Sequence, residues 1–272
     1  MLLKVRRGYM RKIILNTIAY QTYIQNQNVT QENLIEQIAD HGFDGVELRR
    51  EFFINLGDEL LASSKIAKSR SLNVFYSVPV ELFCQGHLNP NLSLFTKEAE
   101  LLGASRINFV MGEFEGFTRE IASNLNELMR GKQLRILVEN DQTQARGTLS
   151  FLSGFIKEAD LYNVSIGLLC DIGNFYYAGE DPLKVIPKLM PHIEYLHLKN
   201  MAISQLKIQP CLNRGDIDVL KLLEEIDEEI PIAIESMYEG DLQKINCAIQ
   251  QDLNFLKKHD VQNSGSMIGG TL

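Results

Sequence analysis

The sequence has few cysteines, and none of them form a close pair. Cys84, Cys170, Cys211 and Cys247 lie far apart in a chain of 272 residues, without a CxxC motif. This spacing excludes a disulfide framework and a zinc knuckle, and it indicates reduced thiols and a cytoplasmic protein. Long apolar runs are absent too, so we expect no segment that spans a membrane. The basic start MLLKVRRGYMRK is not followed by an apolar stretch, so we expect no signal peptide.

Positive charge is also in deficit. The formal net charge is -8 and the isoelectric point is near 5.2, so the average field repels nucleic acids and anionic membranes. The glycine-rich fingerprint of dinucleotide-binding folds is missing after the first expected strand, where the sequence reads ILNTIAYQ. With 45% hydrophobic and 23% charged residues, the composition is that of a globular protein with a sizeable core.

What the sequence does contain is a repeat of short β-rich runs. Eight of them recur at steps of 28 to 37 residues, at 13–18, 44–48, 73–78, 105–110, 134–139, 165–171, 193–199 and 231–236. Segments with helical spacing lie between them, at 31–42, 92–104, 117–131 and 217–229 among others. Several of these end at Gly42, Gly103 or Gly131, which suit a left-handed C-cap. Eight apolar strands alternating with helices predict an α/β fold, a closed (β/α)8 barrel.

No linker or low-complexity block divides the chain. We therefore expect one barrel domain over residues 1–260, followed by a polar and flexible tail at 261–272. Homo-oligomerisation is left open.

Polar residues stand where the expected strands end, at Asn16, Glu47, Ser77, Asn108, Glu139, Asp171, His197 and Glu235. In a barrel these ends form the mouth where catalysis takes place. Alone, each acid is more typical of a cap or salt bridge, and a histidine of the core. Glu139, Asp171, His197 and Glu235, however, come from four successive strands. Three carboxylates and an imidazole form a hard donor set that favours Mn²⁺, Mg²⁺ or Co²⁺, with Zn²⁺ as a further candidate.

Three further charged residues alternate inward with apolar neighbours. Glu47 and Arg49 flank Leu48, and they form either an internal ion pair or part of a substrate site. Lys199 lies two residues beyond His197 on the same side of its strand. It is either a cation that anchors the substrate or a counter-ion to the carboxylates.

These residues resemble the xylose isomerase-like superfamily of sugar phosphate isomerases and epimerases. A closer resemblance is to the 2-ketogluconate utilisation epimerase-like proteins. It rests on GVELRREFF (45–53), VFYSVPVELF (74–83), GHLNP (86–90), ILVENDQT (136–143), DIGNF (171–175) and AIESMYEGD (233–241). In one departure, Asn174 stands where many relatives carry a histidine that contacts the substrate.

The resemblance implies a small-molecule carbohydrate substrate, either a sugar, a sugar phosphate or a sugar acid. It also implies that Glu139, Asp171, His197 and Glu235 bind a divalent metal ion while Glu139 and Glu235 transfer protons next to a carbonyl. The expected substrate-binding residues are Glu47, Arg49, Asn108, Asn140, Asn174 and Lys199.

Three other functions compete with this reading. A dehydroshikimate-type dehydratase needs the same proton abstraction. An abasic-DNA endonuclease of related fold needs many histidines for three zinc ions, and this chain has five in all. A non-catalytic sugar-acid binding protein would use Arg49, Lys199 and Asn140.

In the segment 213–218, we expect Asp216 to cap a helix, with Arg214 as a less favoured contact for a substrate anion. Residues 84–90 form either a lid or, more simply, a surface loop.

Overall fold

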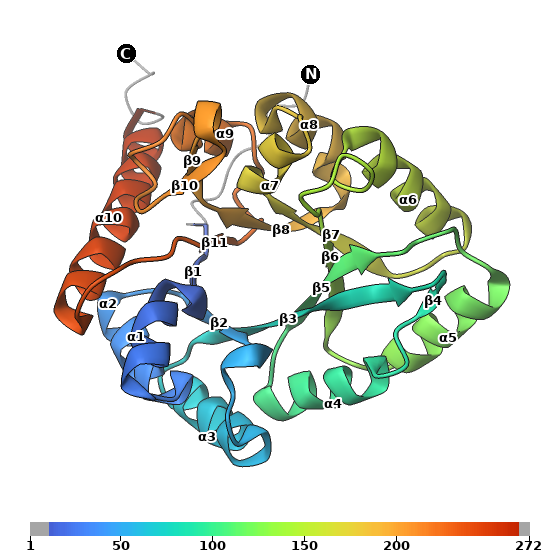
Figure 1. Ribbon diagram of the computed structural model, residues 1–272, viewed down its shortest axis with the longest axis horizontal. Helices are drawn as coiled ribbons and strands as arrows, with labels where there is room; N and C mark the ends of the chain where they lie inside the picture. Colours follow the sequence, from blue (N-terminus) through green and yellow to red (C-terminus); the bar gives the residue numbers. More distant parts are fainter. Residues whose placement is uncertain (1–10, 267–272) are drawn as a thin grey trace.

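The computed structural model describes residues 11–266, with side chains described up to residue 258, and its centre is a closed barrel of eight parallel strands (Figure 1). The strand order is β2-β1-β11-β8-β7-β6-β5-β3, and the pairing of β2 with β3 closes the ring. The barrel strands are β1 (Ile13–Asn16), β2 (Gly45–Arg49), β3 (Asn73–Cys84), β5 (Arg106–Gly112), β6 (Arg135–Glu139), β7 (Ile166–Asp171), β8 (Ile193–Leu198) and β11 (Ile232–Ile234). The predicted (β/α)8 barrel is confirmed.

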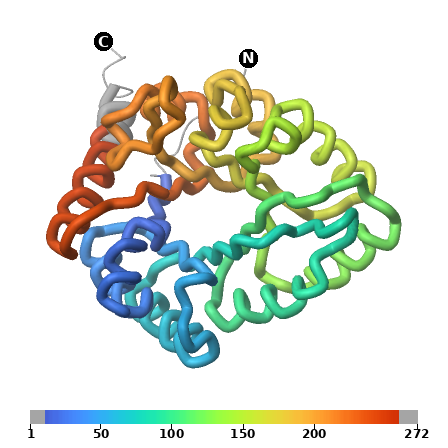
Figure 2. The backbone as a smooth tube through the Cα atoms, in the orientation of Figure 1, coloured from blue at the N-terminus to red at the C-terminus, as the bar shows by residue number. Residues whose placement is uncertain are grey.

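Helices surround the strands and cover the outside of the barrel (Figure 2). They are α1 (Gln21–Gln27), α2 (Ile35–His41), α3 (Leu56–Ser69), α4 (Leu92–Leu102), α5 (Arg119–Met129), α6 (Leu149–Leu161), α7 (Ile172–Tyr177), α8 (Pro182–Leu189), α9 (Val219–Glu224) and α10 (Leu242–Ser266). Short 3₁₀ turns lie at Thr17–Tyr20, Gln31–Leu34, Arg50–Phe52, Met190–His192 and Ile203–Gln205. The last helix packs beside the first ones, where Asn246 and Gln250 of α10 bond Gln37 and His41 of α2.

The helix boundaries agree with the glycine signals. Gly42, Gly103 and Gly131 adopt the left-handed conformation, with φ of 87°, 70° and 76°. Residues 261–266, expected to begin the tail, belong to α10, and residues 1–10 and 267–272 lie outside the described chain. No helix among the described residues is long and apolar enough to cross a bilayer.

Two segments extend beyond the predicted barrel units. Strand β3 continues to Cys84 and folds back onto β4 (His87–Leu88) as an antiparallel hairpin. After β8, a second small sheet pairs β9 (Asn200–Ala202) with β10 (Lys207–Gln209). Both extensions follow the C-terminal ends of barrel strands, where loops shape the mouth.

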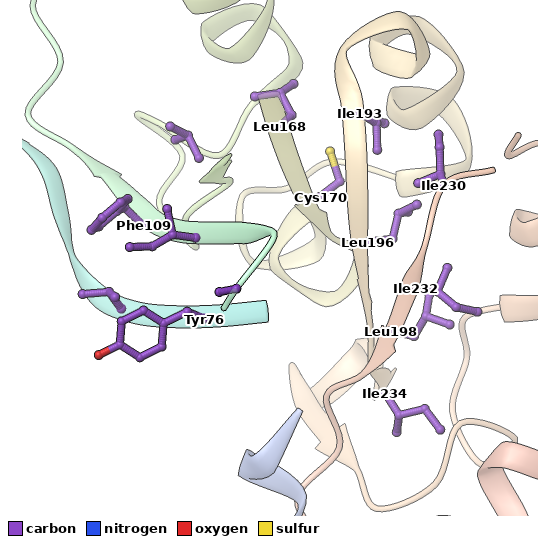
Figure 3. Packing of buried hydrophobic residues seen from close by; sticks show 14 of the residues in the cluster. Tyr76, Phe109, Leu168, Cys170, Ile193, Leu196, Leu198, Ile230, Ile232 and Ile234 are labelled. Carbon is purple, nitrogen blue, oxygen red and sulfur yellow. The ribbon is translucent and has the colours of Figure 1, made fainter. Parts of the chain in front are cut away.

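The strands separate two apolar layers. Residues pointing outward pack against the helices and form the large core, part of which Figure 3 shows around Leu168, Cys170 and Leu196. Residues pointing inward form a second, smaller cluster that fills the barrel, consisting of Ile14, Phe75, Leu137, Leu169, Tyr195 and Ala233. Because side chains alternate along a strand, each inward position recurs after two residues.

This alternation determines where the polar strand ends lie. Leu137 precedes Glu139 by two residues, Leu169 precedes Asp171, and Tyr195 precedes His197. Each polar residue therefore stands one inward position above the apolar layer that fills the barrel. The inner apolar cluster forms the floor, and the polar strand ends form the layer above it.

Candidate active site

The four predicted metal ligands meet at this polar layer. Glu139 ends β6, Asp171 ends β7, His197 lies in β8 and Glu235 follows β11. Each residue offers one ligand atom, and these four atoms all lie within 4.8 Å of one another. Asp171 and His197 stand directly opposite each other in the pairing of β7 with β8. The register of four neighbouring strands thus brings the four side chains together.

Hydrogen bonds to one atom of Asp171 and to one atom of His197 orient both side chains, so that the second ligand atom of each faces the cluster. Asp171 Oδ1 accepts from the backbone N–H groups of Gly173 and Asn174, at 2.8 and 3.0 Å, and caps α7. His197 Nε2 lies 2.7 Å from Glu47 Oε2 and donates its proton, because a carboxylate can only accept. These second atoms are buried among the other charges of the cluster, because Lys199 pairs with Asp171 Oδ2 and Glu235 Oε2 lies 3.2 Å from His197 Nδ1. Three carboxylates and one imidazole that gather their ligand atoms in this way are a donor set that fits a cation, so this cluster can bind a divalent metal ion.

Two cations already touch the cluster from inside the protein. The Lys199 ammonium group forms an ion pair with Asp171 Oδ2 and lies 3.3 Å from Glu235 Oε2. The Arg49 guanidinium lies 3.2 Å from Glu235 Oε1 and also pairs with Glu51. Of the two predicted roles for Lys199, the structure shows the counter-ion. Of the two predicted roles for Arg49, the structure shows an internal ion pair, and its partners are Glu235 and Glu51.

The shared burial and charge shift the pKa values of this cluster strongly. Burial raises the pKa of Asp171 to about 8, and burial together with the Glu235 charge raises the pKa of Glu139. Burial alone would also raise the pKa of Glu235, but the charges of Lys199 and His197 outweigh it and hold that pKa well below its usual range. Burial alone would lower the pKa of His197, but two neighbouring carboxylates raise it well above its usual range.

Metal binding by this cluster is expected to release protons. Glu139, Asp171 and His197 all have raised pKa values, and a metal ion binds only their deprotonated forms. Raising the pH removes the competing protons, so the apparent Mn²⁺ affinity should rise about tenfold per pH unit for each proton released. Titrations between about pH 6 and pH 8, repeated in two buffers with different ionisation enthalpies, measure this release. An affinity that does not change over this range would contradict it.

A cavity of about 360 Å³ opens above the cluster at the mouth of the barrel. Among the predicted substrate-binding residues, those that line it are Arg49, Asn108, Asn140, Asn174 and Lys199. Glu47 does not line it, because its carboxylate is fully buried between His197 Nε2 and the hydroxyl of Tyr195, each at 2.7 Å. The structure therefore places Glu47 behind the histidine, away from the cavity.

Two of the lining amides also hold the cluster in shape. Asn140 Oδ1 accepts from the Asp171 backbone N–H at 2.7 Å, and Asn140 Nδ2 donates to the Asp171 carbonyl at 3.1 Å. Asn174 Nδ2 donates to Glu139 Oε1 at 3.2 Å, while Gln142 donates to Asn174 Oδ1 at 3.1 Å. Asn174 thus contacts a predicted metal ligand and the cavity at once.

Sequence reasoning missed three residues of this site. Tyr195 supports Glu47, and its signal was available, since it lies two residues before His197 on the same inward face. Gln142 lines the cavity in the segment after β6. Gly173 provides space, because a Cβ atom there would meet Lys199 Cε and Cγ at 2.8 Å. Gly173 belongs to the DIGNF segment, but no pattern in the sequence indicated this contact with Lys199.

The segment after β9 differs from the prediction. Asp216 does not cap a helix; Asp218 does, by accepting from the Lys221 N–H at 3.1 Å, while Asp216 accepts from Ile203 N. Arg214 does not line the cavity at the barrel mouth but a separate one of about 1000 Å³ beside α1 and α10. Residues 84–90 form the β3–β4 hairpin and do not line the mouth cavity either.

The fold and the four-residue cluster define the class to which the chain is similar. Its architecture is that of the xylose isomerase-like (β/α)8 barrels. A xylose isomerase domain containing protein from Salmonella typhimurium LT2 superposes with a TM-score of 0.69 and 13% identity, covering 92% of this chain and 99% of that one. For D-allulose 3-epimerase from Methylomonas sp. in complex with D-allulose, the TM-score is 0.68 with 16% identity and coverages of 92% and 98%. A "probable 3-DHS dehydratase AsbF" from Bacillus anthracis superposes with a TM-score of 0.65 and 15% identity, covering 90% of this chain and 98% of that one.

At the level of sequence, the chain is similar to the uncharacterized protein YihM of Escherichia coli K12. The two are 22% identical over 227 residues, which cover 78% of this chain and 67% of YihM. No model of a known protein family matches the sequence.

Proposed function

We propose that this protein is a carbohydrate isomerase or epimerase that moves a proton on a carbon next to a carbonyl group. The observation that carries the proposal is the cluster of Glu139, Asp171, His197 and Glu235, of which Glu139 and Glu235 line a cavity of about 360 Å³. The cavity is lined by amide side chains as well as charges, and amides both donate to and accept from sugar hydroxyl groups. The similarity of the fold to sugar epimerases supports this class.

Glu139 and Glu235 are the residues we assign to proton transfer. They come from strands on either side of the pair β7 and β8, and both line the cavity. Their pKa values are shifted in opposite directions, as a pair of one acid and one base requires. One glutamate then removes the proton from the substrate carbon, and the other returns a proton to the opposite face.

Asp171 and His197 mainly hold the cation that this donor set fits. Mn²⁺, Mg²⁺ or Co²⁺ suit three carboxylates and one imidazole, and Zn²⁺ is the further candidate. When bound, a divalent ion supplies a Lewis acid that polarises the carbonyl oxygen and stabilises the charge of the enediolate. Glu47 keeps the imidazole turned toward the cluster, and Asn140 keeps Asp171 in place through its backbone.

The substrate is proposed from the lining of the cavity and from the resemblance of the sequence. Arg49 and Lys199 reach the cavity with their cationic groups beside Glu235. They suit the carboxylate of a sugar acid, so keto sugar acids of 2-ketogluconate utilisation are the first compounds to test. Unsubstituted ketoses and sugar phosphates complete the panel.

The direct test is proton exchange in D₂O. The protein is incubated with Mn²⁺ and each candidate ketose, sugar phosphate or keto acid, and the products are followed by NMR. Deuterium at a carbon next to the carbonyl, together with a new epimer or isomer, is the expected result. A panel without exchange, in the presence of bound metal, would overturn the proposal and favour a sugar-acid binding protein.

A dehydratase is the second candidate, favoured by the structural similarity to AsbF. Its first step is the same proton abstraction, but a hydroxyl group then leaves as water. Product analysis separates the two, because a dehydratase yields an unsaturated or aromatic acid and an epimerase yields a compound of unchanged mass. A product lighter by one water would replace the epimerase assignment.

The Glu47 carboxylate is expected to strengthen metal binding without touching the metal. Glu47→Gln keeps an acceptor near His197 Nε2 but removes the charge that makes the imidazole a better ligand. The affinity for Mn²⁺ should fall about tenfold. Tyr195→Phe is the matched control, since it removes the other hydrogen bond of Glu47 and leaves the contact with His197. Equal affinities of Glu47→Gln and wild type, measured by titration, would argue against this role.

A further inference from the structure

The Lys199 ammonium group lies against two of the four predicted metal ligands, Asp171 and Glu235. Asp171 has one oxygen left for a cation, since Oδ1 caps α7, and that remaining oxygen, Oδ2, pairs with the Lys199 ammonium group. Glu235 Oε2 lies 3.3 Å from the same nitrogen and 3.2 Å from His197 Nδ1. The ammonium group therefore contacts two of the carboxylate oxygens that a metal ion in this cluster would need.

The chain is built so that Lys199 can reach this position. Its stem passes over Gly173, where an added Cβ atom would meet Lys199 Cε and Cγ at 2.8 Å and Cδ at 3.2 Å. Lys199 is 6% exposed, and Asp171 is fully buried. A buried lysine of this kind is retained only when carboxylates compensate its charge. Here the compensating groups are Glu235 and the ionised form of Asp171.

We propose that Lys199 is a resident cation that competes with the divalent metal ion for Asp171 and Glu235, so that metal binding expels its ammonium group from the cluster. Without metal, Lys199 neutralises carboxylates that would otherwise repel one another. A metal ion bound to the same oxygens would lie next to a like charge, and the ammonium group must therefore leave. The expelled group is then free to meet an oxygen of the substrate in the cavity, which Lys199 already lines. The inference rests on the metal site of the proposed function but not on the reaction.

Competition predicts that removing Lys199 makes metal binding tighter. Lys199→Met keeps the length of the stem and removes the charge, so the affinity for Mn²⁺ should increase about tenfold or more. Gly173→Ala pushes the stem aside without changing any charge, and it should shift the affinity in the same direction. Lys188→Met, on the exposed surface of α8, makes the same change in net charge and should leave the affinity unchanged.

The measurement is a Mn²⁺ titration of the full chain at one pH, with free Mn²⁺ followed by electron paramagnetic resonance. Tighter binding by both Lys199→Met and Gly173→Ala supports competition. If both variants bind Mn²⁺ no more tightly than wild type, the competition is overturned. The same holds if none of the proteins binds Mn²⁺. If Lys199→Met fails to fold without metal, Gly173→Ala decides the outcome, since it retains every charge.

This result and the proposed function can fail separately. Equal Mn²⁺ binding by wild type and variants, together with deuterium exchange by the wild type, would remove the competition and leave the function standing. Tighter binding by the variants, with no exchange on the whole panel, would keep the competition and remove the function.

Discussion

Glutamine at position 139 or 235 is expected to slow epimerisation by about 10²- to 10⁴-fold, the usual contribution of a positioned acid or base. The substitution keeps the size of the side chain and removes its ability to carry a proton. In the wild type, Asn174 Nδ2 donates to Glu139 Oε1 at 3.2 Å, and the amide oxygen of Glu139→Gln can still accept this hydrogen bond. The loss should therefore appear in the rate, followed by NMR of the product, with the thermal unfolding of this variant close to that of wild type.

The two variants should differ in deuterium exchange. Each retains one glutamate, which can still remove a proton from the substrate epimer that faces it and return a deuteron to the same side. Glu139→Gln should therefore exchange one epimer without inverting it, and Glu235→Gln should exchange the other. The matched control is Glu127→Gln on the exposed face of α5, which should match wild type in both assays. Epimerisation at the wild-type rate in both variants would exclude this pair as the acid and base.

The architecture and the position of the candidate site could be read from the sequence because both depend on periodicity. Apolar strands recurring with the length of one βα unit predict a closed barrel. Within each strand, alternation places the residue two positions after an inward apolar side chain at the mouth, as Leu169 and Asp171 illustrate. Residue type then indicates metal chemistry, so strand period and composition alone suffice for this step.

The partners of individual side chains could not be read in the same way. Glu47 and His197 are 150 positions apart, and their contact exists only because the barrel closes. Lys199 had two reasonable roles, and the choice depends on which carboxylate oxygens other hydrogen bonds leave free. Gly173 matters only because the side chain of Lys199, which follows β8, passes over it. These are consequences of packing, which no local pattern in the sequence encodes.

The wrong capping residue has a similar cause, and it leads to Asn200, the first residue of β9. Asn200 Nδ2 donates to the carbonyls of Leu212 and Ile217, at 2.5 and 3.0 Å. Its Oδ1 accepts from the N–H groups of Met201 and Ile217, at 2.8 and 3.0 Å. Gly215 lies so close that an added Cβ atom would meet Asn200 Oδ1 at 2.0 Å. These four hydrogen bonds of the Asn200 side chain fix where the segment turns, so that Asp218 begins α9.

Asn200→Ala is expected to destabilise the protein by about 3 kcal/mol, because it strands several buried backbone groups at once. Urea unfolding measures the loss as a lower midpoint at an unchanged slope. Asn200→Asp keeps the acceptor but turns a carboxylate oxygen toward the two carbonyl oxygens that Nδ2 served, so it should destabilise the protein at least as much as Asn200→Ala. Asn213→Ala, an exposed asparagine of the same segment, is the matched control and should unfold with wild type. Equal midpoints for Asn200→Ala and Asn213→Ala would mean that other contacts hold the segment. The hydrogen bonds of Asn200 would then not explain why Asp218 caps α9.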